Sequence, residues 1–161
     1  MMEAHGHAQL GNTRECILAL QTAEREFVPP NDNTPQWLSY FDEAYLSAKF
    51  GHVLRDLGRP AAAERFARQS LNMRDGYDRG RMFNTALLAW TLADQGAADE
   101  AASHAREAAE LAAGMSSARA SAYIAETTRS MTPYRTSAAV HEFLGLTAPN
   151  PGPVPRRNGG S

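Results

Sequence analysis

The sequence lacks most of the features that would assign a chemistry to it. Its 161 residues include a single cysteine, Cys16, so neither an intramolecular disulfide nor a metal site built from several cysteines can form. No run approaches the roughly eighteen apolar residues of a membrane helix, and the first ten residues lack the pattern of a signal peptide. We therefore expect a cytoplasmic protein that does not enter a membrane.

An excess of charge of one sign is also missing. The chain has 16 Lys and Arg against 18 Asp and Glu, a formal net charge of −2. This balance gives no general electrostatic reason for direct binding to nucleic acid or to an anionic membrane. With 43% hydrophobic and 21% charged residues, the composition is that of one folded domain.

Catalytic and metal-binding motifs are absent as well. The chain contains no GxSxG, HExxH, phosphate-binding loop or dinucleotide fingerprint. Its histidines, at positions 5, 7, 52, 104 and 141, lack metal-ligand spacing apart from the loose pair His5 and His7. We therefore expect no enzyme activity, no cofactor and no metal site.

What the sequence does contain is a repeat. Residues 57–71 read LGRPAAAERFARQSL and residues 95–109 read QGAADEAASHAREAA, and a shift of 38 positions pairs Asp56 with Asp94 and Gly58 with Gly96. The N-terminal segment aligns with the first copy at a spacing of 47, which pairs Gly11 with Gly58. The excess of nine equals the length of VPPNDNTPQ, residues 28–36, which we interpret as an inserted loop.

Each unit has the pattern of a helical hairpin. Apolar residues at helical spacing precede Gly58 and Gly96, and a second helical run follows each glycine. A glycine in the left-handed conformation ends a helix at little cost, and Pro60 suits the first turn of the next helix. Asp99 and Glu100 favour a helix start in the second copy through the helix dipole.

Small residues predict how the two helices of a hairpin pack. Gly51 and Ala63 in the first copy, like Ala89 and Ala101 in the second, are expected on facing sides, where larger side chains would push the helices apart. Cys16 aligns with Ala63 and Ala101. We therefore interpret it as a buried small residue and not as a nucleophile.

This pattern resembles the tetratricopeptide repeat family. The large-small pairs Phe50-Gly51 and Leu88-Ala89, each with a leucine three residues further on, match the first helix of that repeat. The resemblance implies an all-α fold, a right-handed superhelix of antiparallel helical hairpins (an α-solenoid). The spacing of 38 exceeds the usual 34 by about one helical turn, and because the extra residues fall between Leu71 and Leu88, we expect longer helices there.

The repeat predicts the boundaries of the chain's parts. The helical repeat domain covers residues 1–146, with a partial first repeat at 1–27, the inserted loop at 28–36, and full repeats at 37–75 and 76–113. C-terminal capping helices occupy 116–146, with Ser116 or Ser117 and then Thr132 as caps and Pro133 in a first turn. The Pro- and Gly-rich residues 147–161 read as a disordered tail.

A narrower resemblance is to one group of proteins that contain such repeats. The run from Trp37 to Leu71, followed by RGRMFNTALLA and SSARA, is similar to the repeat region of actinobacterial helix-turn-helix transcriptional regulators. That likeness implies a sensor or interaction module with a regulatory role. This sequence contains no recognition-helix motif of its own.

The family resemblance also implies a groove on the concave side of the repeats. Aromatic side chains beside charged ones in this groove would suit the binding of a short peptide. The same aromatic side chains could instead complete the packing between hairpins. Tyr45, Phe83 and Trp90 fit both interpretations. The candidate partner-binding residues are Tyr45, Lys49, His52, Arg55, Phe83, Trp90, Asp94, Arg119 and Glu126.

Three hypotheses follow for function. The first is a protein- or peptide-binding module with a regulatory role. The second is a small-molecule sensor, which needs a closed apolar pocket of about 300 Å³ or more between helices. The third is a structural element that self-associates, for example as a homodimer, through apolar surface on its N-terminal hairpin.

Overall fold

The described residues of the computed structural model, 2–35 and 41–148, are mostly helical and contain no strand. This confirms the all-α class. The elements are α1 (Met2–Gln9), α2 (Thr13–Glu26), α3 (Glu43–Asp56), α4 (Pro60–Ser70), α5 (Asp78–Ala93), α6 (Ala98–Ala113), α7 (Ala118–Met131), the 3-10 helix η2 (Thr132–Tyr134) and α8 (Ala138–Thr147).

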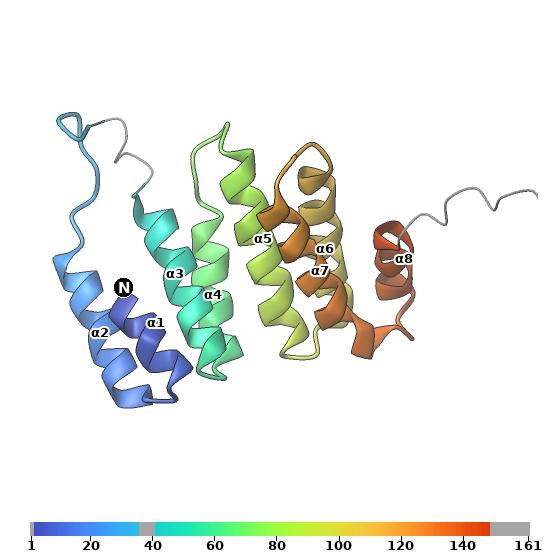
Figure 1. Ribbon diagram of the computed structural model, residues 1–161, viewed down its shortest axis with the longest axis horizontal. Helices are drawn as coiled ribbons and strands as arrows, with labels where there is room; N and C mark the ends of the chain where they lie inside the picture. Colours follow the sequence, from blue (N-terminus) through green and yellow to red (C-terminus); the bar gives the residue numbers. More distant parts are fainter. Residues whose placement is uncertain (1, 36–40, 149–161) are drawn as a thin grey trace, which may run out of the picture.

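Helices that follow one another pair as hairpins. α1 packs on α2, α3 on α4 and α5 on α6, and these pairs lie side by side along the longest axis of the molecule (Figure 1). α7 packs against both α5 and α6, while α8 packs mainly on α6. Hydrophobic residues therefore form two clusters, one centred on α5 and α6 and one joining the first two hairpins.

The hairpin turns share one construction. Gly58 and Gly96 have positive φ angles of 68° and 80°, as predicted, and Gly11 has 72°. After Gly58, the amide of Arg59 donates to the carbonyl of Leu54 at 2.9 Å; the amide of Ala97 makes the equivalent bond to Leu92 at 3.0 Å. These bonds satisfy carbonyl groups that the helix end leaves free, so the local sequence is enough to reverse the chain.

The helix starts follow from the sequence too. α4 begins at Pro60, and Asp99 and Glu100 lie in the first turn of α6, as expected. The carboxylate of Asp42 accepts a hydrogen bond from the backbone amide of Tyr45 at 2.9 Å and so caps α3.

The expectation of close approach between the helices of a hairpin is confirmed at Gly51. A Cβ atom there would lie 3.4 Å from the carbonyl oxygen of Ala63 and 2.9 Å from Cδ2 of Leu87. Gly51 therefore lets α3 approach both its hairpin partner and the next hairpin. Ala63, Ala89 and Ala101 are fully buried.

The expectation of longer helices between Leu71 and Leu88 is wrong for the first of them. α4 ends at Ser70, and residues 71–77 form a loop in which Gly76 has a φ of 84°. The segment LNMRDGY has turn residues and few apolar ones at helical spacing, so nothing holds α4 longer. The Asn84 side-chain amide donates to the carbonyl of Ser70 at 2.9 Å, which ties the end of α4 to α5 just before this loop.

The capping helices correct a second expectation. Ser117 does cap α7, by accepting from the amide of Ala120. Thr132, however, is not a cap: it is helical, its hydroxyl donates to the carbonyl of Thr128, and with Pro133 it forms η2. The cap of α8 is Ser137, whose extended backbone leaves its hydroxyl free to accept from the amide of Val140.

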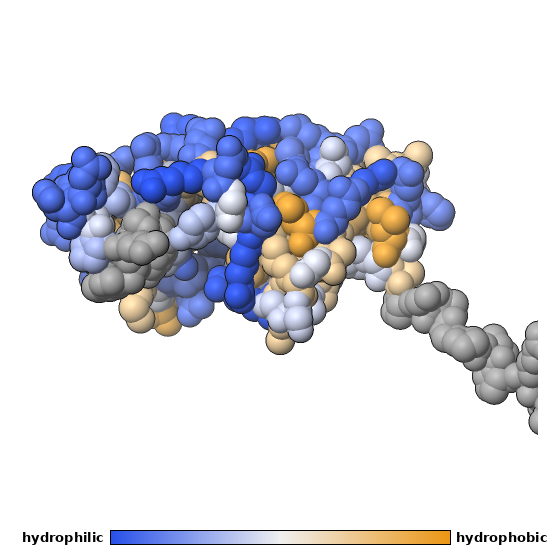
Figure 2. Space-filling view, turned by 90° about the horizontal axis from the view of Figure 1, so that it is seen from above, coloured by the Kyte–Doolittle hydropathy of each residue, from blue (hydrophilic) through white to orange (hydrophobic). Residues whose placement is uncertain are grey.

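Several expected features fall partly outside the described residues. The end of the inserted loop at residue 36, residues 37–40 of the first full repeat and residues 149–161 of the expected tail are among them. Seen from above, the described surface is mostly hydrophilic, with hydrophobic residues gathering toward the end that holds α7 and α8 (Figure 2). Across residues 2–35 and 41–148, every helix is too short or too polar to cross a membrane.

Candidate functional site

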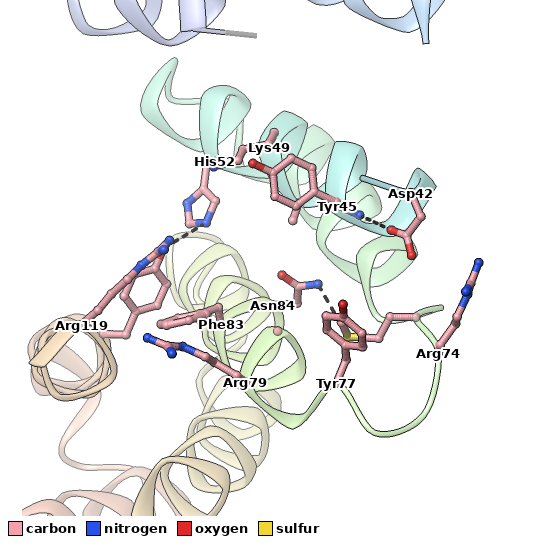
Figure 3. Close-up of a pocket in the computed structure, with 14 residues that line it drawn as sticks. Asp42, Tyr45, Lys49, His52, Arg74, Tyr77, Arg79, Phe83, Asn84 and Arg119 are labelled. Carbon is pink, nitrogen blue, oxygen red and sulfur yellow. Dashed lines mark hydrogen bonds between the residues drawn. The ribbon is translucent and has the colours of Figure 1, made fainter. Parts of the chain in front are cut away.

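A pocket of about 370 Å³ opens between α3, the 71–77 loop, α5 and α7 (Figure 3). Its volume falls within the range of ligand pockets, roughly 300 to 1,000 Å³. The lining residues are Asp42, Tyr45, Ala48, Lys49, His52, Met73, Arg74, Tyr77, Arg79, Gly80, Phe83, Asn84, Arg119 and Tyr123.

One wall is a single face of α3. Tyr45, Lys49 and His52 are spaced so that a helix places them on one side, and Ala48 between them leaves room above the backbone. The Lys49 ammonium lies 5.2 Å from the centre of the Tyr45 ring, so the cation rests against an aromatic face.

The opposite wall combines the 71–77 loop with the start of α5. Tyr77 and Phe83 face α3 across the pocket, and Arg79 lies beside Phe83 in Figure 3. Gly80 has no side chain at the point where Met73 passes: a Cβ atom there would lie 2.8 Å from the methionine Cε. The loop can therefore fold back onto α5.

α7 closes one end of the pocket with Arg119 and Tyr123. The Arg119 guanidinium carbon lies 4.5 Å from the centre of the Phe83 ring and 5.6 Å from that of Tyr123. The Phe83 and Tyr123 rings are themselves 4.6 Å apart, in an edge-to-face arrangement. These contacts hold the Arg119 side chain in place, although the residue is exposed to solvent.

His52 lies where the helices meet, among aromatic rings. Its Nε2 is 3.4 Å from the Tyr123 hydroxyl, and its ring centre is 6.0 Å from that of Trp90. Burial, followed by the positive charges of Lys49, His5, Arg55 and Arg119, lowers the pKa of His52 from 6.5 to about 4. The imidazole is therefore neutral at neutral pH and adds no charge to the pocket.

The charge of the lining is strongly one-sided. Lys49, Arg74, Arg79 and Arg119 contribute four cations against the single carboxylate of Asp42, which already caps α3. Within the described residues none of the four cations has a carboxylate oxygen within 4.0 Å. An anionic group would therefore find unneutralised partners there.

The structure brings together five of the residues proposed from the sequence. Tyr45, Lys49, His52, Phe83 and Arg119 all line the pocket.

The other four candidates lie elsewhere, and the expectation of an open groove lined by Trp90 needs correction. Trp90 is 5% exposed, because α7 packs across α5 and covers it. Its indole N–H donates to the Thr127 hydroxyl at 2.8 Å, which satisfies the buried donor. Trp90 is therefore a core residue between α5 and α7.

Arg55 and Asp94 form an ion pair between hairpins. The Arg55 Nε donates to the Asp94 carboxylate at 2.6 Å, and the guanidinium lies 5.1 Å from the centre of the Trp90 ring. They link the end of α3 to the end of α5. Glu126 pairs with Arg129 on α7 and does not line the pocket.

Sequence reasoning missed much of the far wall. Arg74 and Tyr77 lie in the stretch for which longer helices were expected, so the sequence gave no reason to turn them toward α3. Arg79 and Tyr123 carried a usable signal: each is four residues from a predicted site residue, Phe83 and Arg119 respectively, and so shares its helix face.

Neither a metal site nor a reactive cysteine receives support from the described residues. No group of three or more His, Cys, Asp or Glu side chains suited to a metal occurs within residues 2–35 and 41–148. Cys16 is fully buried, and its thiol donates to the carbonyl of Ala4 at 3.2 Å. Burial raises the pKa of this thiol, which fits the packing role expected for it.

No protein-family model, curated protein or solved structure matches the chain. The likeness to tetratricopeptide repeats therefore rests on the residues of this sequence alone.

Proposed function

We propose that the chain is a tetratricopeptide-like interaction module that binds a peptide segment of a partner protein in the pocket between α3, α5 and α7. The observation that carries the proposal is the pocket itself, in which aromatic rings line one cavity with cations that have no carboxylate partner among residues 2–35 and 41–148. Aromatic and arginine side chains dominate the binding energy of protein interfaces.

The arrangement of hairpins supports a tetratricopeptide-like superhelix. Three turns share the same glycine construction, and Gly51 allows α3 to contact both α4 and α5 closely. In such an array the first helices of successive hairpins line the concave side, and both α3 and α5 contribute to the pocket. The proposed regulatory role rests on the resemblance to actinobacterial regulators.

A display library of short peptides tests this function, with binding measured on purified wild-type protein. We expect the selected peptides to bind Tyr77→Ala at least about tenfold more weakly than wild type, because Tyr77 lines the pocket. Tyr77 is 51% exposed, so removal of its ring leaves the core intact. Leu146→Ala, at a similarly exposed apolar residue outside the pocket, serves as the control and should bind normally. Selected peptides that bind Tyr77→Ala as well as wild type would contradict the proposal.

The second candidate is a small-molecule sensor, favoured by the pocket volume of about 370 Å³. It predicts that the library yields no peptide, while a small anionic or aromatic compound raises the melting temperature of wild type and not of Tyr77→Ala.

A further inference from the structure

The four cations of the pocket do not share one point, because Arg119 and Arg74 lie at opposite ends. In Figure 3, Arg119 reaches in from α7 at one end, where the Arg79 guanidinium also lies, 3.2 Å from the Ser117 hydroxyl at the start of α7. Lys49 is on the α3 wall, and Arg74 projects from the loop at the opposite end. They come from four separate elements. One small anionic group could meet the cations at one end, but it would leave those at the other end unmatched.

Several arginines outside the pocket are paired with carboxylates. Arg55 pairs with Asp94, Arg68 with Glu64 and Glu100, and Arg106 with Glu142. The pocket arginines have other neighbours: Arg79 donates to the Ser117 hydroxyl at 3.2 Å, and Arg119 lies over aromatic rings. These contacts orient the cations without neutralising them. After burial, the positive charges of Lys49 and Arg119 are among the causes that lower the pKa of His52.

Aromatic rings line the pocket between the cations. Tyr45 and Phe83, from opposite walls, are half-buried, and Tyr77 at the loop is exposed. An apolar or aromatic side chain can enter here and exclude water from the neighbouring charges, which strengthens their attraction for an anion.

Resting on the proposed function, we propose that the occupant is an acidic segment within a partner polypeptide: an aromatic or apolar side chain enters between Tyr45 and Phe83, and acidic side chains on both sides of it meet Arg119 and Arg74. An extended chain advances about 3.3 Å per residue, so acidic residues on both sides of the central one are separated along the pocket. A free carboxyl terminus is not required, because the cations are distributed and not gathered at one point.

The probe is a fluorescent, amidated peptide with a central phenylalanine and two glutamates on each side. Its matched partner has glutamine in place of every glutamate. We expect the acidic peptide to bind at least about tenfold more tightly by fluorescence polarisation in low salt, and the difference to shrink as sodium chloride is added. Equal binding of the two peptides would overturn the proposal.

Charge reversals locate the contacts. Arg74→Glu and Arg119→Glu should each weaken the acidic peptide by about tenfold and leave the glutamine peptide nearly unchanged. Arg14→Glu makes the same change in net charge on the exposed surface of α2, outside the pocket, and should have little effect. An equal loss with Arg14→Glu would show a non-specific charge effect and would overturn the assignment. Circular dichroism of each variant verifies folding, and a variant that unfolds is replaced by the glutamine substitution at the same position.

Competition distinguishes a small anion from a peptide. Inorganic phosphate at millimolar concentration should displace the acidic peptide no better than sodium chloride of equal ionic strength. Specific displacement by phosphate would overturn the peptide assignment. If the library instead yields neutral peptides that depend on Tyr77, the interaction function holds and this inference fails. The two failures are therefore distinguishable.

Discussion

At the scale of single residues, His52 shows how the environment decides chemistry. It occupies a groove position in the sequence pattern and lines the pocket, yet its ring also meets Trp90 and Tyr123. The groups that face it are Lys49 and Arg55 from its own helix, Arg119 and Tyr123 from α7, and His5 from α1. All the charged ones are cationic or can become so, so they disfavour a second positive charge.

We predict that the protein loses stability as the pH falls from 6.5 toward 4. The folded pKa of His52, about 4, lies below its ordinary value of 6.5, so in this window the unfolded state binds the proton more readily. His52 has no effect of this kind on the unfolding free energy well above pH 6.5, and the full loss, reached below pH 4, is roughly 3 kcal/mol.

Urea denaturation at pH 7 and pH 4.5 measures this effect. His52→Gln should show the smaller decrease in unfolding free energy between the two pH values. His141→Gln, at an exposed histidine of α8, serves as the control and should behave like wild type. A wild-type loss identical to that of His52→Gln would assign the acid sensitivity to other groups, such as Glu64, whose pKa is lowered by hydrogen bonds from Gln95 and Arg68.

At the scale of elements, the missing side chain of Gly51 sets the distance between α3 and its neighbours. A Cβ atom at this position would lie 2.9 Å from Leu87 of α5 and 3.4 Å from the backbone of α4. α3 therefore packs closely against both α4 and α5. The Arg55 and Asp94 pair then joins the ends of α3 and α5. Because the pocket lies between these two helices, their separation determines its width.

We predict that Gly51→Val destabilises the protein by about 1–3 kcal/mol, since the branched side chain must displace Leu87 and press on α4. Gly145→Ala is the matched control: it is also helical, but no atom lies within 4 Å of the added Cβ. It should be neutral or more stable by about 0.5 kcal/mol through helix propensity. Thermal denaturation compares the two. A Gly51→Val protein as stable as wild type would show that α3 is not closely packed there.

At the scale of the whole molecule, the fold is a row of hairpins in which each contacts mainly its neighbours. Such a row leaves apolar side chains at its ends. Leu10, Leu18 and Val28 near the N-terminal hairpin and Leu146 near the other end are more than half exposed. Together with Met2, which is 92% exposed, they come from separate helices and loops, and single exposed apolar residues are common on monomeric proteins.

We therefore predict a monomer in solution. Light scattering over a hundredfold range of concentration should give the mass of one chain throughout. A mass that doubles with concentration and returns to that of one chain in Leu18→Glu would favour the self-association hypothesis, with the N-terminal hairpin as the contact.

The parts predicted from the sequence are those with local causes. Gly58 and Gly96 end helices because the left-handed conformation is cheap for glycine, and Pro60 begins one because its nitrogen has no hydrogen to leave unbonded. The loop at 71–77 was missed because repeat arithmetic counts residues but does not say whether they extend a helix. The cap at Ser137 was missed because Thr132 is an equally good cap by residue type.

The sequence by itself determined the helical hairpins, their glycine turns and the face of α3 that carries Tyr45, Lys49 and His52, since each depends on residues within one or two turns of a helix. Only the tertiary structure decided that Trp90 is covered while Phe83, two turns earlier on α5, lines a pocket. The reason is that a helix fixes the direction of a side chain, but a distant element, here α7, decides whether that side chain meets protein or open space. The same packing brings Arg119 and Arg74 to opposite ends of one pocket, although they are far apart in the chain.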